Sequence, residues 1–298
     1  MDVNTMPHWM ASGFALVGRF SPKTMLAFRH WLKTKKIINW KRPRNMQEFC
    51  YCQLFRDDTD LDLFAVVADK YRVRKYVDRI VGGQYLNELY GTWENGNLLD
   101  FTKLPKKFVL KTNNGCATNI FVDDKSTVDQ KSICGKLNHW LNVPLGYATG
   151  QIQYSKIKPL IIAEHFLSQE SFGNEGLIDY KFYCIDGEPI NVLVCGNRAE
   201  RSHTFDAMIY DMNWNELPEF VSPQFHHINN MPKPVCFEEL KEVVGKLSRP
   251  FHFSRIDFYI INNRPVFGEI TMTPNMGGAL STRGDEYLFS ILKKRGLV

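Results

Sequence analysis

The sequence predicts an α+β fold, with a mainly helical region over residues 1–100 and a strand-rich core over residues 101–298. Before residue 100, apolar side chains recur at helical spacing in three stretches, residues 14–36, 44–55 and 61–81. After residue 100, short apolar runs alternate with polar residues and are bounded by turn-forming residues, which is typical of strands. The chain has 298 residues, 44% of them hydrophobic, and is long enough to build a core in each region.

The first helical stretch combines apolar and basic side chains. Pro22 suits the first turn of its main helix, and the stretch ends in a basic run over residues 33–36. One interpretation is weak association with an anionic membrane, which places the protein at the inner face of that membrane. The commoner interpretation is a helix that packs on its own domain and turns its basic stripe to water. The sequence leaves both open.

Composition and missing motifs exclude several classes of protein. The net charge of +5 favours polyanionic substrates such as nucleotides, but it is too small and dispersed for a nucleic-acid-binding protein. The seven cysteines form no CxxC pair, which indicates reduced thiols in a cytoplasmic protein. No run approaches the roughly 20 apolar residues of a membrane span. The absence of HExxH and GxSxG motifs argues against zinc-dependent and serine hydrolases.

A strand, a polar loop and a second strand follow one another at the start of the core. The strand over Phe108–Lys111 ends in a lysine, the loop covers residues 112–119, and residues 120–122 return as a strand. Such a loop can wrap backbone N–H groups around phosphates, with Lys111 supplying charge. The sequence has no GxxxxGK[ST] or GxGxxG motif, so this signal is weak alone, and a polar hairpin turn needs no ligand.

Further elements continue the α+β pattern. Ser126 and Asp129 have the spacing of a capping box, which predicts a helix running to about Leu141. A buried strand is expected over residues 160–163, and another over residues 179–185. In the second strand the polar side chains share one face, and they are Asp179, Lys181 and Tyr183.

The hairpin over residues 253–274 carries the strongest chemical pattern in the chain. A two-residue loop alone would place Asp257 and Glu269 on opposite faces, whereas a three-residue loop or one bulge pairs them. In the second register Arg255 pairs with Thr271 on the same face. Paired carboxylates on rigid strands suit Mg²⁺, a hard cation that keeps positions open for phosphate. The alternative is a surface hairpin with an ordinary Arg255–Glu269 ion pair.

Taken in order, these segments resemble the ATP-grasp superfamily, and most closely its teichuronopeptide-biosynthesis (TupA-like) branch, found among genes for bacterial surface polysaccharides. About four fifths of the chain takes part in this resemblance. The matching segments are residues 42–48, 68–74, 104–113, 179–183, 211–214, 255–259 and 267–274. The resemblance implies an ATP-grasp fold, in which two α+β subdomains clamp ATP. These are expected over residues 101–167 (the phosphate-loop subdomain) and 168–298 (the metal-binding subdomain), after the helical N-terminal region.

The resemblance also implies roles in binding ATP. It places Lys111 at the α-phosphate, Glu164 near the adenine amino group, Asp179 at the ribose and Lys181 facing a phosphate. The loop after Lys111 folds over the phosphates, and the backbone of residues 166–167 reads the edge of the ring. The implied ATP-binding residues are Arg74, Lys111, Asn113, Asn114, Gly115, Glu164, Phe166, Leu167, Asp179 and Lys181.

Metal and catalytic roles follow from the same resemblance. Asp257 and Glu269 would ligate Mg²⁺, and Arg255 together with Lys181 would stabilise the transferring phosphoryl group. The family's third metal ligand is an asparagine, and Thr271 stands there in this sequence. A single hydroxyl is a poorer ligand than an amide oxygen, which leaves the number of metal ions open. The covering loop is also poorer in glycine than is usual, and the N-terminal region lacks the usual βαβ units.

The expected activity is that of an ATP-dependent carboxylate–amine ligase. It would form an amide between an amino acid or another amine and a uronic-acid carboxylate, in capsule or O-antigen polysaccharide biosynthesis. Candidate acceptor contacts are Arg198, His203, Asn275 and Gly277, and for each the alternative is a plain loop. Two other functions remain open, a kinase using the same nucleotide site and a non-catalytic nucleotide- or glycan-binding protein. The oligomeric state cannot be read from the sequence.

Overall fold

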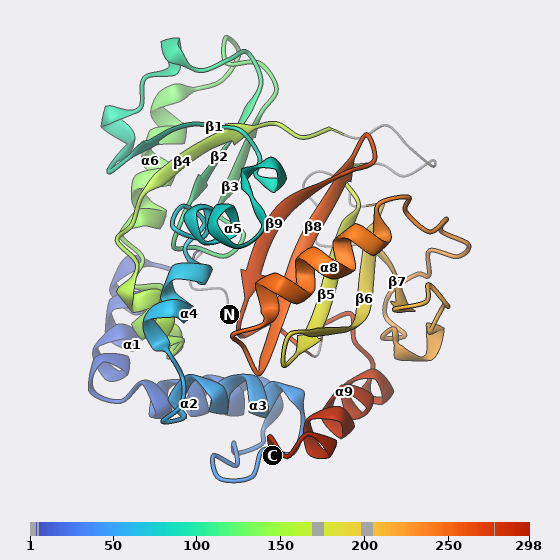
Figure 1. Ribbon diagram of the computed structural model, residues 1–298. Coiled ribbons are helices and arrows are strands. Elements are labelled where there is room, and N and C mark those ends of the chain that lie inside the picture. Colours follow the sequence, from blue (N-terminus) through green and yellow to red (C-terminus); the bar gives the residue numbers. More distant parts are fainter. Residues whose placement is uncertain (1–3, 5, 169–175, 198–204, 277) are drawn as a thin grey trace. The chain divides into compact units, whose positions relative to one another are not determined.

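The computed structural model describes residues 4, 6–168, 176–197, 205–276 and 278–298. The chain forms two compact units, each drawn from three segments and described here by itself (Figure 1). Unit 1 comprises Met1–Ile38, Leu54–Arg74 and Asn87–Phe166, and unit 2 comprises Asn39–Gln53, Lys75–Leu86 and Leu167–Val298. The predicted boundaries at residues 100 and 167 stay predictions.

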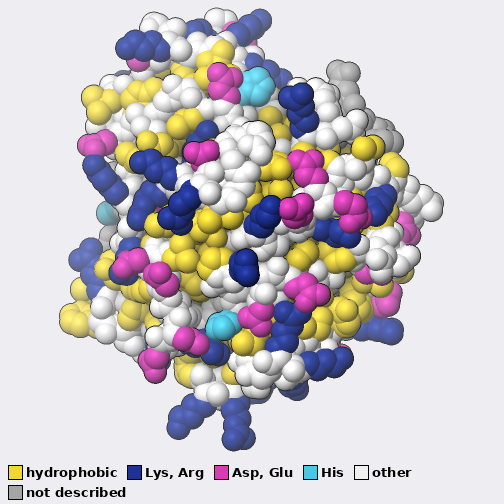
Figure 2. Space-filling view, in the orientation of Figure 1, with side chains coloured by type: hydrophobic (Ala, Val, Ile, Leu, Met, Phe, Trp, Pro, Cys, Tyr) yellow, Lys and Arg dark blue, Asp and Glu magenta, His cyan; other side chains and the backbone are white. Residues whose placement is uncertain are grey.

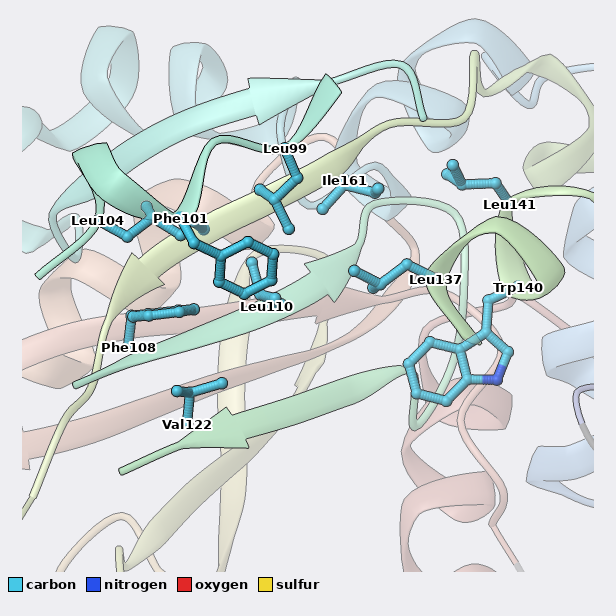
Figure 3. Close-up of a cluster of buried hydrophobic side chains, with 11 residues drawn as sticks. Leu99, Phe101, Leu104, Phe108, Leu110, Val122, Leu137, Trp140, Leu141 and Ile161 are labelled. Atoms are coloured by element: carbon cyan, nitrogen blue, oxygen red, sulfur yellow. The ribbon is translucent and has the colours of Figure 1, made fainter. Parts of the chain in front are cut away.

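Unit 1 contains a four-stranded antiparallel sheet in the order β1-β4-β2-β3. Its strands are β1 (Leu89–Trp93), β2 (Phe108–Thr112), β3 (Asn119–Val122) and β4 (Ile161–His165). One face of the sheet packs on helix α6 (Gln130–Leu141). Figure 3 shows Leu137 of that helix near Leu110 of the sheet, with Trp140 on the far side of Leu137. This contact buries one of the unit's apolar clusters.

The predicted capping box before α6 is wrong. The helix begins one residue after Asp129, whose carboxylate accepts a hydrogen bond from the backbone N–H of Ser132 at 3.1 Å. Ser126 instead donates its own N–H and hydroxyl to Asp124, at 2.9 and 2.6 Å. Ser126 is already engaged by Asp124. Asp129 accepts from a backbone N–H that has no partner within the helix, so Asp129 is the N-cap.

Two predicted helices are each broken in the structure. Residues 14–36 belong to α1 (His8–Phe20) and α2 (Pro22–Thr34), with Ser21 accepting from the N–H of Thr24 and Pro22 in the first turn as predicted. Residues 61–81 form α4 (Leu61–Ala68) and α5 (Val73–Val81).

The remaining helices are α3 (Met46–Cys52), α7 (Leu145–Thr149), α8 (Phe237–Ser248) and α9 (Thr282–Lys294). Within the described ranges, every helix is too short or too polar to cross a bilayer.

Unit 2 is built on a five-stranded antiparallel sheet in the order β7-β6-β5-β8-β9. Helix α8 lies across this sheet, where Phe237 stacks on Phe182 with ring centroids 6.2 Å apart (Figure 1). The strands are β5 (Asp179–Ile185), β6 (Glu188–Gly196), β7 (Asp206–Asp211), β8 (Phe253–Ile261) and β9 (Arg264–Thr271).

The β8–β9 hairpin has the register that pairs the two carboxylates. Asn262 and Asn263 form a two-residue turn, with φ of 50° and 60°, which matches the twist of the flanking strands. A bulge then inserts Gly268 between the partners of Asp257 and Phe258. The bulge therefore restores the pairing of Asp257 with Glu269 that a two-residue turn alone would prevent.

Substitution of Gly268 by alanine is expected to destabilise the protein by about 1–2 kcal/mol. A Cβ atom at this position would lie 3.0 Å from the backbone oxygen of Asp257, so the paired backbone would have to shift by a few tenths of an ångström. Urea unfolding measures the effect. Gly135→Ala in α6 is the control, because a Cβ there meets nothing within 4 Å. Equal free energies of unfolding for the two variants would contradict the tight bulge.

Asp285, in the first turn of α9, is expected to make stability depend on pH. Burial raises the pKa of this carboxyl from 3.8 to about 6, even though it accepts a hydrogen bond from the backbone N–H of Met46. The folded state therefore binds the proton more tightly than the unfolded state, so this contribution to stability falls as pH rises from about 4 to about 6. Asp285→Asn should gain about 1–3 kcal/mol relative to wild type between pH 4 and pH 7. A stability difference that does not vary with pH in urea unfolding would refute this.

Candidate functional site

Unit 2 brings acids and bases together on one face of β5, β8 and β9, and we call this group the carboxylate cluster. Asp257 is its centre and is 2% exposed. The Nζ atom of Lys181 lies 2.6 Å from one oxygen of Asp257, and Arg255 donates to both oxygens at 2.7 Å. The full cluster consists of Asp179, Lys181, Arg255, Asp257, Glu269 and Thr271.

The cluster is closed at one end and open at the other. Arg255 reaches from Asp257 to Glu269, with 2.6 Å between its Nη2 atom and Glu269 Oε1, and the Thr271 hydroxyl donates to the same oxygen at 2.9 Å. The side chain of Asp257 is 3% exposed, whereas that of Glu269 is 44% exposed. The predicted Arg255–Glu269 ion pair exists, but its neighbour Asp257 is buried, so this is not an ordinary surface hairpin.

Both bases of the cluster stay protonated at neutral pH. Burial alone lowers the pKa of Lys181, but the carboxylates of Asp179 and Asp257 raise it by more, so its pKa lies above the ordinary value. Burial likewise lowers the pKa of Arg255, and Asp257 and Glu269 outweigh that effect. Burial raises the pKa of Asp257, which the two cations oppose. The cluster is thus an array of fixed charges in a buried setting.

The carboxylate oxygens of the cluster are ligands of the kind that binds a divalent cation, although in this structure both oxygens of Asp257 accept from Lys181 and Arg255. Asp179, Asp257 and Glu269 carry three formal negative charges against the two positive charges of Lys181 and Arg255, which leaves a negative excess. Carboxylate oxygens are the ligands that Mg²⁺ prefers, and the half-exposed Glu269 gives access. Within the described parts of the chain, no three or more His, Cys, Asp or Glu side chains converge as a metal site. An ion on Asp257 and Glu269 would therefore keep positions open for water or phosphate.

Unit 1 holds a second group of charged side chains, the lysine–glutamate cluster, formed by Lys111, Arg74 and Glu164. Lys111 on β2 lies 2.7 Å from Glu164 Oε2 on the neighbouring strand β4. Arg74 reaches the other oxygen of Glu164 at 3.3 Å and donates to the backbone oxygen of Asn87 at 2.7 Å. The side chains are 10–26% exposed. Three residues predicted to bind ATP therefore meet within unit 1, with one excess positive charge that suits an anion.

The side chain of Asn113 anchors the polar loop after β2 to the interior of unit 1. Asn113 is fully buried, and its side-chain amide donates to Asp69 at 2.9 Å and to the backbone oxygen of Lys158 at 3.0 Å. Its side-chain oxygen accepts from the N–H of Leu160 at 2.7 Å. The predicted ATP contact of Asn113 is thus not available to its side chain, because these bonds commit the amide to the interior.

Asn114 and Gly115, the next predicted ATP-binding residues, lie beside that anchor. Asn114 is 6% exposed, and its side-chain oxygen has no hydrogen-bond partner within the described parts of the chain. The backbone oxygen of Gly115 accepts a hydrogen bond from Lys70. A Cβ atom on Gly115 would lie 2.5 Å from the hydroxyl of Thr118, so the loop tolerates only glycine there. The buried, unsatisfied oxygen of Asn114 suits a donor brought by a ligand.

The other predicted site residues are placed as follows. Phe166 packs edge-on against Phe121 at 5.9 Å, and Lys107 lies 3.8 Å above the centre of the Phe166 ring, so its backbone rather than its side chain is left for a nucleotide. Leu167 is half-buried, and Asn275 is exposed. Arg198, His203 and Gly277 lie outside the described residues. The structure therefore groups Arg74, Lys111 and Glu164 within unit 1. It groups the predicted metal ligands with Asp179, Lys181 and Arg255 within unit 2.

Asp69 and Lys70 bind the loop after β2, through Asn113 and Gly115, and were not among the residues predicted for the site. Asp69 is 1% exposed and accepts from the N–H groups of Tyr71 and Arg72 at 2.8 and 3.1 Å, which ends α4 and starts a turn. The same oxygen of Asp69 accepts from Asn113. A single acidic residue in an otherwise basic stretch could have indicated a turn at Asp69. The helical periodicity over residues 61–81 instead predicted one continuous helix.

Comparisons with known proteins give one family match and several similar solved structures. The family model described as TupA-like ATPgrasp matches residues 51–291. The crystal structure of L-amino acid ligase from Bacillus licheniformis matches with a TM-score of 0.50 and 14% identity, covering 85% of this chain and 55% of that one. D-alanine–D-alanine ligase from Bacillus anthracis matches with a TM-score of 0.47 and 15% identity, covering 76% and 63%. No curated protein matches.

These likenesses differ in what they establish. The chain spans less than two thirds of the length of either solved ligase, and at such low identity the Bacillus licheniformis enzyme supports the fold alone. The family model covers most of the chain, including the lysine–glutamate cluster and the carboxylate cluster. The chain therefore belongs to the TupA-like ATP-grasp family.

Proposed function

We propose that this protein is an ATP-dependent ligase that joins a carboxylate to an amine through an acyl phosphate. The acid would be a uronic-acid group of a bacterial surface polysaccharide or its precursor, and the amine an amino acid. The reaction would take place in the cytoplasm, where ATP is available. The observation that carries the proposal is the carboxylate cluster, in which Lys181 and Arg255 are held charged beside the buried Asp257.

The reaction needs no nucleophile from the protein. An oxygen of the substrate carboxylate attacks the γ-phosphorus of ATP, the bond to the bridging oxygen breaks, and ADP leaves. The amine nitrogen then attacks the acyl carbon, phosphate departs with the former carboxylate oxygen, and the nitrogen loses a proton. Because negative charge moves between oxygens throughout, the protein accelerates the reaction by positioning reactants and by placing fixed positive charges.

The two bases of the carboxylate cluster provide those charges. Arg255 and Lys181 stay cationic because carboxylates surround them, so they can stabilise a phosphoryl group without reorganising. Asp257 and Glu269 would hold Mg²⁺, which supplies charge neutralisation at the phosphates when bound. Asp179 lies 3.4 Å from Lys181, and we assign it to positioning that lysine rather than to the ribose.

Unit 1 is proposed to contact the nucleotide. Lys111 and Arg74 would hold phosphate oxygens, and Glu164, which they now bind, would accept from the adenine amino group. The unsatisfied oxygen of Asn114 would accept a further donor, and the backbone of residues 166–167 would meet the ring edge. The fully engaged Asn113 is proposed to support the loop rather than to touch ATP.

A substrate panel tests this proposal. The protein is incubated with Mg²⁺ and ATP, with UDP-glucuronate or UDP-galacturonate, and with each amino acid in turn. The proposed ligase releases ADP only when both acid and amine are present, and mass spectrometry shows a product formed with loss of water. ADP release that needs no amine would indicate a kinase. No ATP turnover, together with nucleotide binding in calorimetry, would support a binding protein instead.

A further inference from the structure

Helix α1 exposes several of its large apolar side chains. Viewed along the helix, Trp9, Leu16 and Phe20 fall on one stripe, with exposed fractions of 73%, 58% and 86%. Val17 lies beside them and is 49% exposed. Figure 2 shows hydrophobic side chains at the surface at the lower left, where Figure 1 places α1. An ordinary surface helix of a globular protein has the opposite arrangement.

The inward side of α1 explains this reversal. Its buried residues are Ala11, Ala15 and Gly18, all small. The helix packs so closely on α7 that a Cβ atom at Gly18 would lie 1.9 Å from the backbone oxygen of Tyr147. Since only small residues fit this contact, Trp9, Leu16 and Phe20 lie on the opposite side of the helix and stay exposed.

Helix α2 extends the apolar surface. Phe28, Trp31 and Leu32 are 42–44% exposed. The Phe28 ring lies 6.4 Å from that of Phe14 on α1 and 6.5 Å from that of Trp31, so these three rings form an aromatic row that joins the two helices. We call the exposed side chains of this surface the α1–α2 face, and they are Trp9, Leu16, Val17, Phe20, Phe28, Trp31 and Leu32.

The charges that α1 and α2 themselves carry have one sign. Residues 6–38 contain no Asp or Glu, and their basic residues are Arg19, Lys23, Arg29, Lys33, Lys35 and Lys36. Lys35 lies 4.6 Å above the ring of Trp31 and is exposed, so positive charge borders the aromatic row directly. A second copy of the same face would meet this charge with like charge, whereas an anionic surface would complement it.

We propose that the α1–α2 face docks on the surface of an anionic lipid bilayer. The apolar stripe of α1 enters the boundary between headgroups and acyl chains, and the lysines and arginines lie among the headgroup phosphates. Exposed tryptophan and phenylalanine suit this boundary, where an apolar ring meets a wet layer. The helices lie in the plane of the surface and do not cross it, in keeping with their length of 13 residues each.

Vesicle flotation tests the proposal with the full chain. Wild-type protein should float with vesicles of phosphatidylcholine containing about one third phosphatidylglycerol, at least tenfold more than with phosphatidylcholine alone, and 0.5 M salt should reduce this binding strongly. The double variant Trp9→Ser/Phe20→Ser should lose at least tenfold in binding. Lys35→Gln/Lys36→Gln should lose about tenfold on anionic vesicles.

A matched control removes apolar side chains that are equally exposed elsewhere. Leu98 and Val235 are 59% and 86% exposed and lie outside α1 and α2, so Leu98→Ser/Val235→Ser should bind vesicles as the wild type does. Circular dichroism and ATP affinity should be unchanged in all variants. Equal flotation of Trp9→Ser/Phe20→Ser and wild type overturns the proposal. A concentration-dependent dimer that this variant abolishes, without vesicle binding by the wild type, also overturns it and assigns the face to a second copy.

Discussion

Replacing Asp257 by asparagine is expected to lower ligase turnover by about a thousandfold. The change removes the negative charge that holds both Lys181 and Arg255 at 2.6–2.7 Å. It also replaces one carboxylate oxygen of a proposed Mg²⁺ ligand by an amide nitrogen, which cannot bind the ion. Two cations then share the buried end of the cluster with less compensation, so the fold should also lose about 2–4 kcal/mol. Turnover is measured at a temperature where circular dichroism shows the variant folded.

Two further variants separate chemistry from stability in this test. Glu269→Gln alters the half-exposed carboxylate of the same cluster, so its stability should change by less than about 1 kcal/mol while turnover falls about a hundredfold. Asp186→Asn is the control, because Asp186 lies in the β5–β6 turn and pairs with His252, outside the cluster. Turnover of Asp257→Asn within threefold of the wild type would remove Asp257 from the mechanism.

Lys111→Met should give the second largest effect, a loss of about a hundredfold in kcat/KM for ATP. The substitution keeps an unbranched side chain, one atom shorter, and removes the ammonium that lies 2.7 Å from Glu164. Glu164 keeps Arg74 at 3.3 Å, so the unit should remain folded. Calorimetry with a non-hydrolysable ATP analogue should show a dissociation constant raised at least tenfold.

The control for Lys111→Met is another lysine of the same unit. Lys106 precedes β2, binds Asp124 at 3.1 Å and is 76% exposed, so Lys106→Met should leave ATP affinity unchanged. If both substitutions weaken ATP binding equally, the effect comes from the general positive charge of the unit. An unchanged affinity in Lys111→Met would remove that lysine from the nucleotide site.

The chemistry of the β8–β9 hairpin was readable from the sequence, but its register was not. Alternation alone placed Arg255 and Asp257 on one face, because side chains in a strand point to opposite sides in turn. Whether Glu269 joined them depended on loop length and on a bulge. A two-residue turn and a bulge at Gly268 offset each other, and no local pattern specifies both.

The breaks between helices escaped prediction for a different reason. Apolar spacing runs on through Ser21 and through Asp69, so the period shows no interruption there. In both places a side-chain oxygen captures backbone N–H groups and competes with the helix. Pro22 marked one of the two breaks, since proline favours a first turn.

Asn113 shows the limit of assigning a site by motif. As a polar residue in a small-residue loop, it has the character of a phosphate ligand. Its amide binds Asp69 and the backbone of residues 158 and 160, groups more than 40 positions away in the chain. Only tertiary structure brings such partners together. The resemblance to a family thus identified the loop. The structure showed that the side chain of Asn113 holds the loop in place and is not available to bind ATP.

The most direct test of the proposed chemistry follows oxygen from the acid to phosphate. The uronic acid of the first productive acid–amine pair is labelled with ¹⁸O in its carboxylate, and the inorganic phosphate released with ADP is analysed by mass spectrometry. An acyl-phosphate ligase transfers one labelled oxygen to each phosphate. Phosphate without label, formed along with the same amide, would contradict activation of the carboxylate by ATP.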